Sequence, residues 1–196
     1  MNQKYRIAIL ASGSGSNAEE IIKYFADHRL IKVELILSNN PRAFVLDRAK
    51  KFNIPTLVFT KEEFSTRVPE WLLEKGITHI VLAGFLWLIP PALLSAYPNK
   101  IINIHPALLP KFGGKGMYGM KVHESVKNAN EIETGITIHL INEKYDEGPI
   151  LYQGKCEVLT TDTPDQIADK VHNLEYACYP KTIEKWILED QNFDWN

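Results

Sequence analysis

A chain of 196 residues with 45% hydrophobic and 23% charged side chains has the composition of one globular domain with a substantial core. Its net charge of −2 argues against a general nucleic-acid binder, which needs a clear excess of Lys and Arg. The two cysteines have neither metal-type spacing nor the density of a disulfide framework, so we expect two inert thiols.

The apolar segments are too short and too interrupted for a membrane protein. The longest run, residues 80–94, is broken by a glycine and two prolines. The first residues lack the long apolar region of a signal peptide. We therefore expect a cytoplasmic protein without a membrane partner.

Short apolar runs alternate with helix-period segments along the first half of the chain. The runs predict strands, and the segments between them predict helices; the strands are expected at 7–10, 33–37, 56–59, 80–83 and 101–104, and the helices near 18–27, 43–52, 69–75 and 90–96. This alternation predicts an α/β fold, a Rossmann-like, mostly parallel sheet with helices on both faces. Ligands of such folds bind beyond the carboxyl ends of the strands.

The second half predicts two later strands, 137–140 and 150–153, that extend the sheet, and a short helix from residue 123. The last helix should begin at Thr163, because Thr163-Pro164-Asp165-Gln166 has the pattern of a capping box. Pro180 is expected to kink or break that helix. Residues 190–196 are expected to form a solvated end.

The first chemical motif is the loop Ser12-Gly13-Ser14-Gly15-Ser16-Asn17, between the first strand and the first helix. Glycines let a backbone approach an anion, and a helix N-terminus offers unpaired N–H groups to a phosphate. The motif is neither GxGxxG nor a Walker loop. A tight turn with Ser16 or Asn17 as the N-cap is the alternative interpretation.

The second motif is Asn103-Ile104-His105-Pro106, at the end of the fifth strand. Residues i and i+2 of a strand point to one face, so an amide donor and an imidazole could meet the same substrate group. A lone histidine bonded only to backbone is the alternative. The third motif is the turn Asp146-Glu147-Gly148-Pro149, where Asp could cap its own backbone. If Asp146 lay beside His105, it would raise the histidine pKa.

Together these three motifs and Glu175-Tyr176-Ala177-Cys178-Tyr179-Pro180 resemble the phosphoribosylglycinamide formyltransferases, over nearly the whole chain. The resemblance implies formyl transfer from 10-formyltetrahydrofolate, a co-substrate, to the amine of glycinamide ribonucleotide. It implies that Asn103 bonds the formyl oxygen, that His105 is the general acid/base, and that Asp146 orients His105 and raises its pKa. It implies no metal and no nucleic-acid partner.

The resemblance also implies the binding residues, in a single domain of 1–196. The ribonucleotide would contact Gly15, Ser16, Asn17, His172 and Glu175. The folate would contact Arg67, Leu86, Trp87, Leu88, Ile89, Asn103, Asn142, Glu143, Lys144, Tyr145 and Asp146. Residues 1–100 would form the phosphate- and nucleotide-binding half, and residues 101–196 the catalytic and folate-binding half. The assembly would be a monomer or a homodimer.

Two features depart from the family pattern. Trp87 stands where relatives often carry Arg, and its alternative role is an apolar pocket wall. The loop 113–120, with four glycines, is longer than in some relatives and suggests a mobile segment near the site. The alternative functions are a formyltetrahydrofolate hydrolase or a related formyltransferase with another amine acceptor, such as methionyl-tRNA. These would usually carry a further domain. A non-catalytic nucleotide-binding module would explain only the glycine loop.

Overall fold

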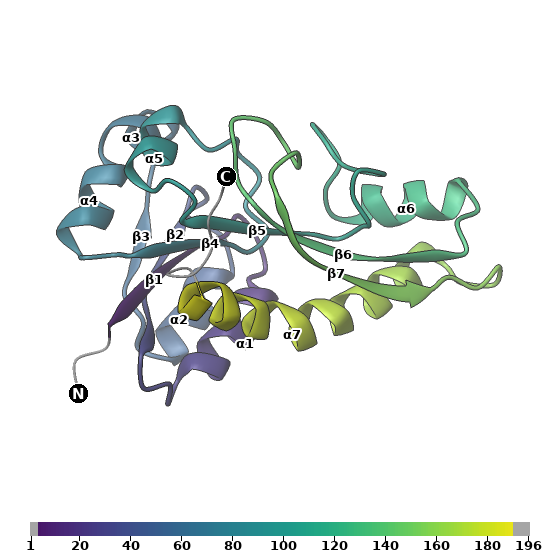
Figure 1. Ribbon diagram of the computed structural model, residues 1–196, viewed down its shortest axis with the longest axis horizontal. Helices are drawn as coiled ribbons and strands as arrows, with labels where there is room; N and C mark the ends of the chain where they lie inside the picture. Colours follow the sequence, from purple (N-terminus) through teal and green to yellow (C-terminus); the bar gives the residue numbers. More distant parts are fainter. Residues whose placement is uncertain (1–3, 190–196) are drawn as a thin grey trace.

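The computed structural model describes residues 4–189 and arranges them around one seven-stranded sheet with the order β3-β2-β1-β4-β5-β6-β7 (Figure 1). The strands are β1 (Tyr5–Leu10), β2 (Ile31–Ser38), β3 (Thr56–Val58), β4 (His79–Leu82), β5 (Ile101–His105), β6 (Glu133–Leu140) and β7 (Ile150–Glu157). The first five pair in parallel, and β6 and β7 add antiparallel partners beyond β5. The predicted Rossmann-like sheet with late strands extending it is confirmed. The expected solvated end, 190–196, lies outside the described residues.

Helices cover both faces of the sheet. They are α1 (Ser16–Phe25), α2 (Val45–Lys51), α3 (Lys61–Thr66), α4 (Val68–Glu74), α5 (Pro91–Ala96), α6 (Met120–Asn128) and α7 (Pro164–Glu189). In Figure 1, α1, α2 and α7 lie below the sheet, and α3, α4 and α5 lie above it. Alternate residues of β1 accordingly enter two separate cores: Ile7 and Ile9 face α1 and α7, whereas Ala8 and Leu10 face the other layer.

Helix α3 was not predicted from the sequence. Its start is a complete capping box, in which the Thr60 hydroxyl accepts from the backbone N–H of Glu63 and the Glu63 carboxylate accepts from that of Thr60. The helix has only six residues and buries only Phe64, so its apolar periodicity is too weak to detect. The corresponding capping box at Thr163 and Gln166 was predicted and is confirmed.

The predicted break of the last helix at Pro180 is wrong, because α7 continues through this residue to Glu189. An interior proline costs a helix about 3 kcal/mol, but each buried core side chain stabilises by roughly 1.5–3 kcal/mol. Tyr179, Ile183 and Ile187 are all completely buried around this point. The Tyr179 hydroxyl also donates to the carbonyls of Leu82 (2.9 Å) and Ile102 (3.3 Å), which ties α7 to β4 and β5. Packing against the sheet therefore keeps the helix continuous.

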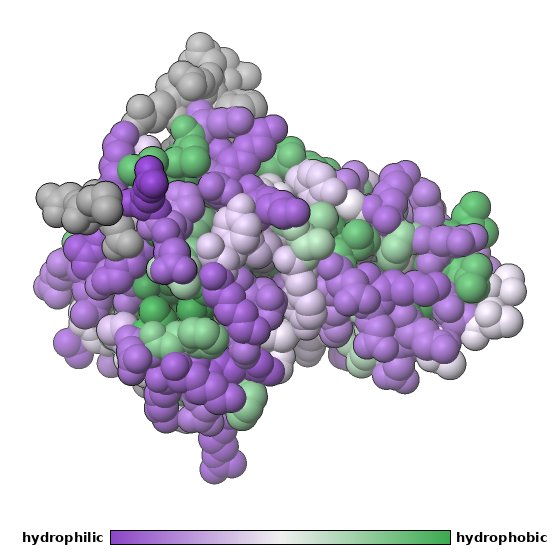
Figure 2. Space-filling view, turned by 90° about the horizontal axis from the view of Figure 1, so that it is seen from below, coloured by the Kyte–Doolittle hydropathy of each residue, from purple (hydrophilic) through white to green (hydrophobic). Residues whose placement is uncertain are grey.

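The face seen from below is mostly hydrophilic, with small scattered apolar patches (Figure 2). None of the helices formed by residues 4–189 combines the length and the apolar character that a membrane crossing requires. Cys156 and Cys178 are both free and half-buried.

Candidate active site

A cavity of about 630 Å³ opens beyond the carboxyl ends of β1, β4 and β5, where ligands of doubly wound sheets bind. It receives side chains or backbone from the loop after β1, the loop after β4, the end of β5, the glycine-rich loop before α6, α6 itself, the β6–β7 loop, and α7. Its lining includes Ser12, Gly13, Ser14, Gly15, Ser16, Asn17, Leu86, Asn103, His105, Gly114, Lys115, His123, Tyr145, Asp146, His172 and Glu175. The three predicted motifs therefore meet in one place.

Strand alternation aims the predicted pair into this cavity. Asn103 and His105 point to one face of β5, while Ile102 and Ile104 enter the core on the other side. Across the antiparallel pairing with β6, Asn103 lies opposite His139, and His105 lies opposite Thr137. Residue His105 is only 4% exposed, so its ring is held by protein contacts rather than by water.

Both ring nitrogens of His105 have a neighbour. Its Nε2–H donates to the carbonyl of Phe112 over 2.8 Å, and its Nδ1 lies 3.5 Å from Oδ2 of Asp146. Burial lowers the pKa of His105, and the Asp146 carboxylate and the Phe112 carbonyl raise it by less. The net pKa is below the ordinary value of 6.5. Asp146 therefore raises the pKa of His105, as expected, but burial, which the sequence does not reveal, lowers it by more.

The Asp146 carboxylate bonds outside its own turn. Its Oδ2 accepts from the backbone N–H of Gly114 over 2.9 Å, and Oδ1 lies 3.6 Å from Nε2 of His139. Burial raises the pKa of Asp146, but the His139 and His105 rings together with the Gly114 N–H outweigh it, so the pKa is lowered. The carboxylate is therefore kept ionised beside His105, and the alternative of an Asp that only caps its own turn does not hold.

The other end of the cavity is formed by the loop after β1 and the start of α1. Gly15 is the N-cap residue and has a left-handed backbone, with φ of 73°, so neither Ser16 nor Asn17 is the N-cap. A Cβ at Gly15 would lie only 2.4 Å from Cγ2 of Val45. This close approach lets the turn present the free N–H groups of the α1 N-terminus to the cavity.

The α1 terminus is joined to α7 at the same end. Asn17 donates from Nδ2 to Oε2 of Glu175 over 2.9 Å. Glu175 is 5% exposed, and burial raises its pKa, partly offset by the Asn17 bond. His172, one turn earlier on α7, lines the cavity next to them. The five residues predicted for the ribonucleotide are thus brought together.

Two histidines of the site were not predicted. The first is His139, whose Nε2 lies 3.1 Å from Nδ2 of Asn103; this contact depends on the β5–β6 register, which the sequence does not reveal. His123 on α6 lines the cavity with a ring that is 2% exposed. Burial, then the charges of His172 and His105, lower the pKa of His123 to about 4.

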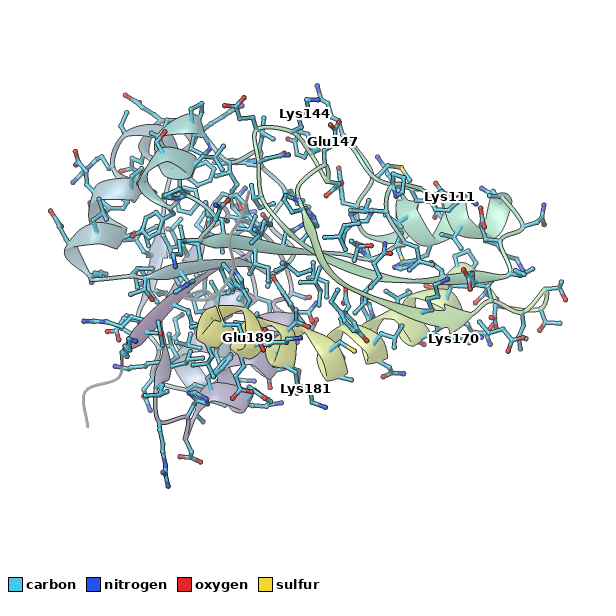
Figure 3. All side chains as sticks on the ribbon, in the orientation of Figure 1. Lys111, Lys144, Glu147, Lys170, Lys181 and Glu189 are labelled. Atoms are coloured by element: carbon cyan, nitrogen blue, oxygen red, sulfur yellow. The ribbon has the colours of Figure 1, made fainter. Side chains whose placement is uncertain are left out.

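The residues predicted for the folate are divided. Leu86, Asn103, Tyr145 and Asp146 line the cavity, but Arg67, Trp87, Leu88, Ile89, Asn142, Glu143 and Lys144 do not. Ile89 is buried in the core, and Leu88 is exposed. The Arg67 guanidinium lies 4.8 Å from the Trp71 ring. Lys144 pairs with Glu147 over 3.0 Å on the outer side of the β6–β7 loop (Figure 3).

Trp87 contributes to an aromatic cluster behind the cavity rather than to the lining. Its ring centroid lies 6.1 Å from that of Phe59, 6.0 Å from Phe64 and 6.3 Å from Phe85. Aromatic pairs at such spacing are each worth about 0.5–1.5 kcal/mol beyond their buried area. Trp87 therefore packs on the apolar core as the alternative interpretation expected, but it does not form a wall of this cavity.

Comparison with known proteins agrees with this geometry. Residues 5–183 match the family described as formyl transferase. The phosphoribosylglycinamide formyltransferase of Bacillus subtilis is 37% identical over 187 residues, which cover 92% of this chain and 93% of the relative. The chloroplastic enzyme of that name from Arabidopsis thaliana is also 37% identical, and the chain spans 65% of its length. The crystal structure of phosphoribosylglycinamide formyltransferase from Bacillus halodurans, 37% identical, superposes with a TM-score of 0.86 over 97% of this chain and 100% of that one.

Proposed function

Since the chain belongs to the formyl transferase family, we propose that it transfers the formyl group of 10-formyltetrahydrofolate to the amine of glycinamide ribonucleotide. The observation that carries the proposal is the grouping of Asn103, His105 and Asp146 in a cavity that also receives the glycine turn before α1, where an anion would bind. Both substrates are small molecules. Glycinamide ribonucleotide presents a phosphate, and 10-formyltetrahydrofolate presents a formyl carbonyl whose oxygen must gain negative charge.

The reaction needs two things from the protein. When the amine nitrogen attacks the formyl carbon, the formyl oxygen becomes an oxyanion, and an N–H of Asn103, which lines the cavity, would donate to it. The amine must also lose a proton, and N10 of the folate must gain one before the C–N10 bond breaks. A single acid/base side chain can carry this proton, so no covalent intermediate with the protein is required.

His105 is the residue suited to move that proton. Because burial lowers its pKa, the ring is neutral near pH 7 and can accept the proton from the amine. The Asp146 carboxylate 3.5 Å away then stabilises the imidazolium until the proton passes to N10. Nδ1 faces Asp146, so the nitrogen that meets the substrate is Nε2. To accept the amine proton, Nε2 must first release the Phe112 carbonyl, and its own proton must move to Nδ1, where the Asp146 carboxylate can accept from it.

The ribonucleotide phosphate would bind the N–H groups after Gly15, with Asn17, His172 and Glu175 around the sugar. Glu175 comes from α7 and bonds Asn17, so a ribonucleotide site built on these residues would draw on both halves of the chain. The folate would enter past Leu86 and Tyr145 and extend toward the remaining residues predicted for it. The cytoplasmic location and a monomeric or homodimeric assembly stay predictions.

The test is to incubate the purified protein with both substrates and to follow tetrahydrofolate and formylated ribonucleotide. Both products should appear together, and only when the amine is present. Release of formate without the amine would favour the hydrolase instead. His105→Ala should lose most turnover, since general acid–base catalysis contributes about 10²–10⁴-fold. His28→Ala is the matched control, because His28 bonds Glu184 away from the cavity. Near-normal activity in a folded His105→Ala protein would refute the mechanism.

A further inference from the structure

His139 lies directly behind the proposed oxyanion donor and has no assigned role in the reaction. It stands on β6 opposite Asn103, and its side chain is completely buried. It does not line the cavity, so it cannot touch a substrate there. Any effect on the reaction must pass through the residues that it contacts, and among the site residues these are Asn103 and Asp146.

The backbone determines which nitrogen of His139 carries a proton. Nδ1 lies 2.8 Å from the carbonyl oxygen of Leu140, and because a carbonyl only accepts, Nδ1 is the donor. In the neutral ring Nε2 is then an acceptor. Nε2 lies 3.1 Å from Nδ2 of Asn103, within hydrogen-bond range, and 3.6 Å from Oδ1 of Asp146, beyond it.

An acceptor at this position selects the orientation of the Asn103 amide. A terminal amide can present either its oxygen or its NH₂ group, and only NH₂ can bond an accepting Nε2. One N–H then goes to His139, and the second is left for a ligand in the cavity. If the Asn103 amide were rotated by half a turn, its NH₂ group and its oxygen would exchange places. The amide oxygen would then face the developing oxyanion and repel it.

We propose that His139 is a positioning residue that, through its backbone-anchored tautomer, holds Asn103 with an N–H available to the formyl oxyanion. This inference rests on the proposed formyl transfer and adds a residue to it. The Leu140 carbonyl fixes the tautomer of the His139 ring, the ring orients the Asn103 amide, and the amide donates to the oxyanion. Residues that lie one layer behind the reacting groups often determine how precisely the substrate-contacting side chains are oriented.

The experiment compares His139→Phe, which fills the space without an acceptor, with His139→Gln, whose Oε1 can accept from Asn103. Ile138→Val is the control, since Ile138 faces the opposite core. Loss of an oxyanion donor costs about 10²–10³-fold in kcat, so His139→Phe should lose roughly 10–100-fold in kcat with KM nearly unchanged. His139→Gln should recover part of that loss. Equal activity of His139→Phe and wild type, or a change only in KM, would overturn the inference.

A double-mutant cycle with Asn103→Ala identifies the pathway. Adding His139→Phe to Asn103→Ala should cost little further, because the residue that His139 positions is already gone. Losses that multiply would overturn the inference, as would coupling to Asp146→Asn in place of Asn103→Ala. Circular dichroism checks the fold, and the smaller His139→Leu replaces His139→Phe if the latter does not fold. A wild-type protein without formyl transfer would instead overturn the proposed function and, with it, this inference.

Discussion

The close approach of Gly15 to Val45 makes Gly15→Ala the sharpest test of the proposed phosphate-binding turn. The new methyl carbon would lie 2.4 Å from Cγ2, 2.5 Å from Cβ and 2.8 Å from Cα of Val45. Because the last of these atoms is backbone, trimming the Val45 side chain cannot relieve the clash. The first turn of α1 and α2 would have to move apart.

The cost can be worked out from two contributions. A left-handed backbone costs a non-glycine residue about 1–2 kcal/mol, and overpacking costs about 1–3 kcal/mol. The free energy of unfolding of Gly15→Ala should therefore fall by roughly 2–5 kcal/mol. With a urea dependence of about 2 kcal/mol per molar, the middle of the usual range, the unfolding midpoint should drop by roughly 1–2.5 M.

Gly13→Ala is the matched control for stability. It lies two residues earlier in the same loop, has no positive φ, and has nothing within 4 Å of the position that its Cβ would take. Its urea midpoint should stay the same or rise slightly, since alanine restricts the unfolded chain. Gly15→Ala should also raise KM for glycinamide ribonucleotide, because the displaced N–H groups no longer meet the phosphate. Equal midpoints for the two variants and an unchanged KM in Gly15→Ala would refute the reasoning.

Three further predictions test the catalytic end and the packing of α7. Asn103→Ala should lower kcat by about 10²–10³-fold in steady-state assays with little change in the urea midpoint, and a change confined to KM would contradict the oxyanion role. His105 must be deprotonated to accept the amine proton, and burial lowers its pKa, so the acid limb of kcat/KM should lie below pH 6.5. Asp146→Asn removes the charge that raises this pKa, so the limb should move to lower pH; a move to higher pH would contradict the assignment. Tyr179→Phe should lower the free energy of unfolding by about 0.5–1.5 kcal/mol through its lost bonds to two sheet carbonyls, measured by urea denaturation, while kcat stays unchanged.

Local chemistry accounts for what could be predicted from the sequence. The buried strands are continuous apolar runs, and the helix between Thr163 and Pro180 carries its own start signal, so both were predictable. The glycines and serines of residues 12–16 likewise indicated a tight turn between the first strand and the first helix. The capping box at Thr60 carried an equally clear signal, but the helix after it is too short for its apolar pattern to support the prediction.

Features that depend on packing across the sheet could not be predicted. The contact of His139 with Asn103 follows from the antiparallel register of β6 on β5, which no local pattern specifies. The lowered pKa of His105 follows from burial that outweighs a nearby carboxylate, and a sequence reveals the carboxylate but not the depth of burial. The continuity of α7 through Pro180 likewise depends on the core beneath it.

The hydrogen bond between Asn17 and Glu175 joins residues that are 158 positions apart. A ribosome makes α1 early and α7 only after every strand of the sheet, so a growing chain lacks part of the proposed ribonucleotide site until α7 has emerged and packed. Ligand binding stabilises only the state that binds, by RT ln(1 + [L]/Kd). The substrate would therefore protect finished molecules from proteolysis while leaving incomplete chains, which lack α7, to be degraded.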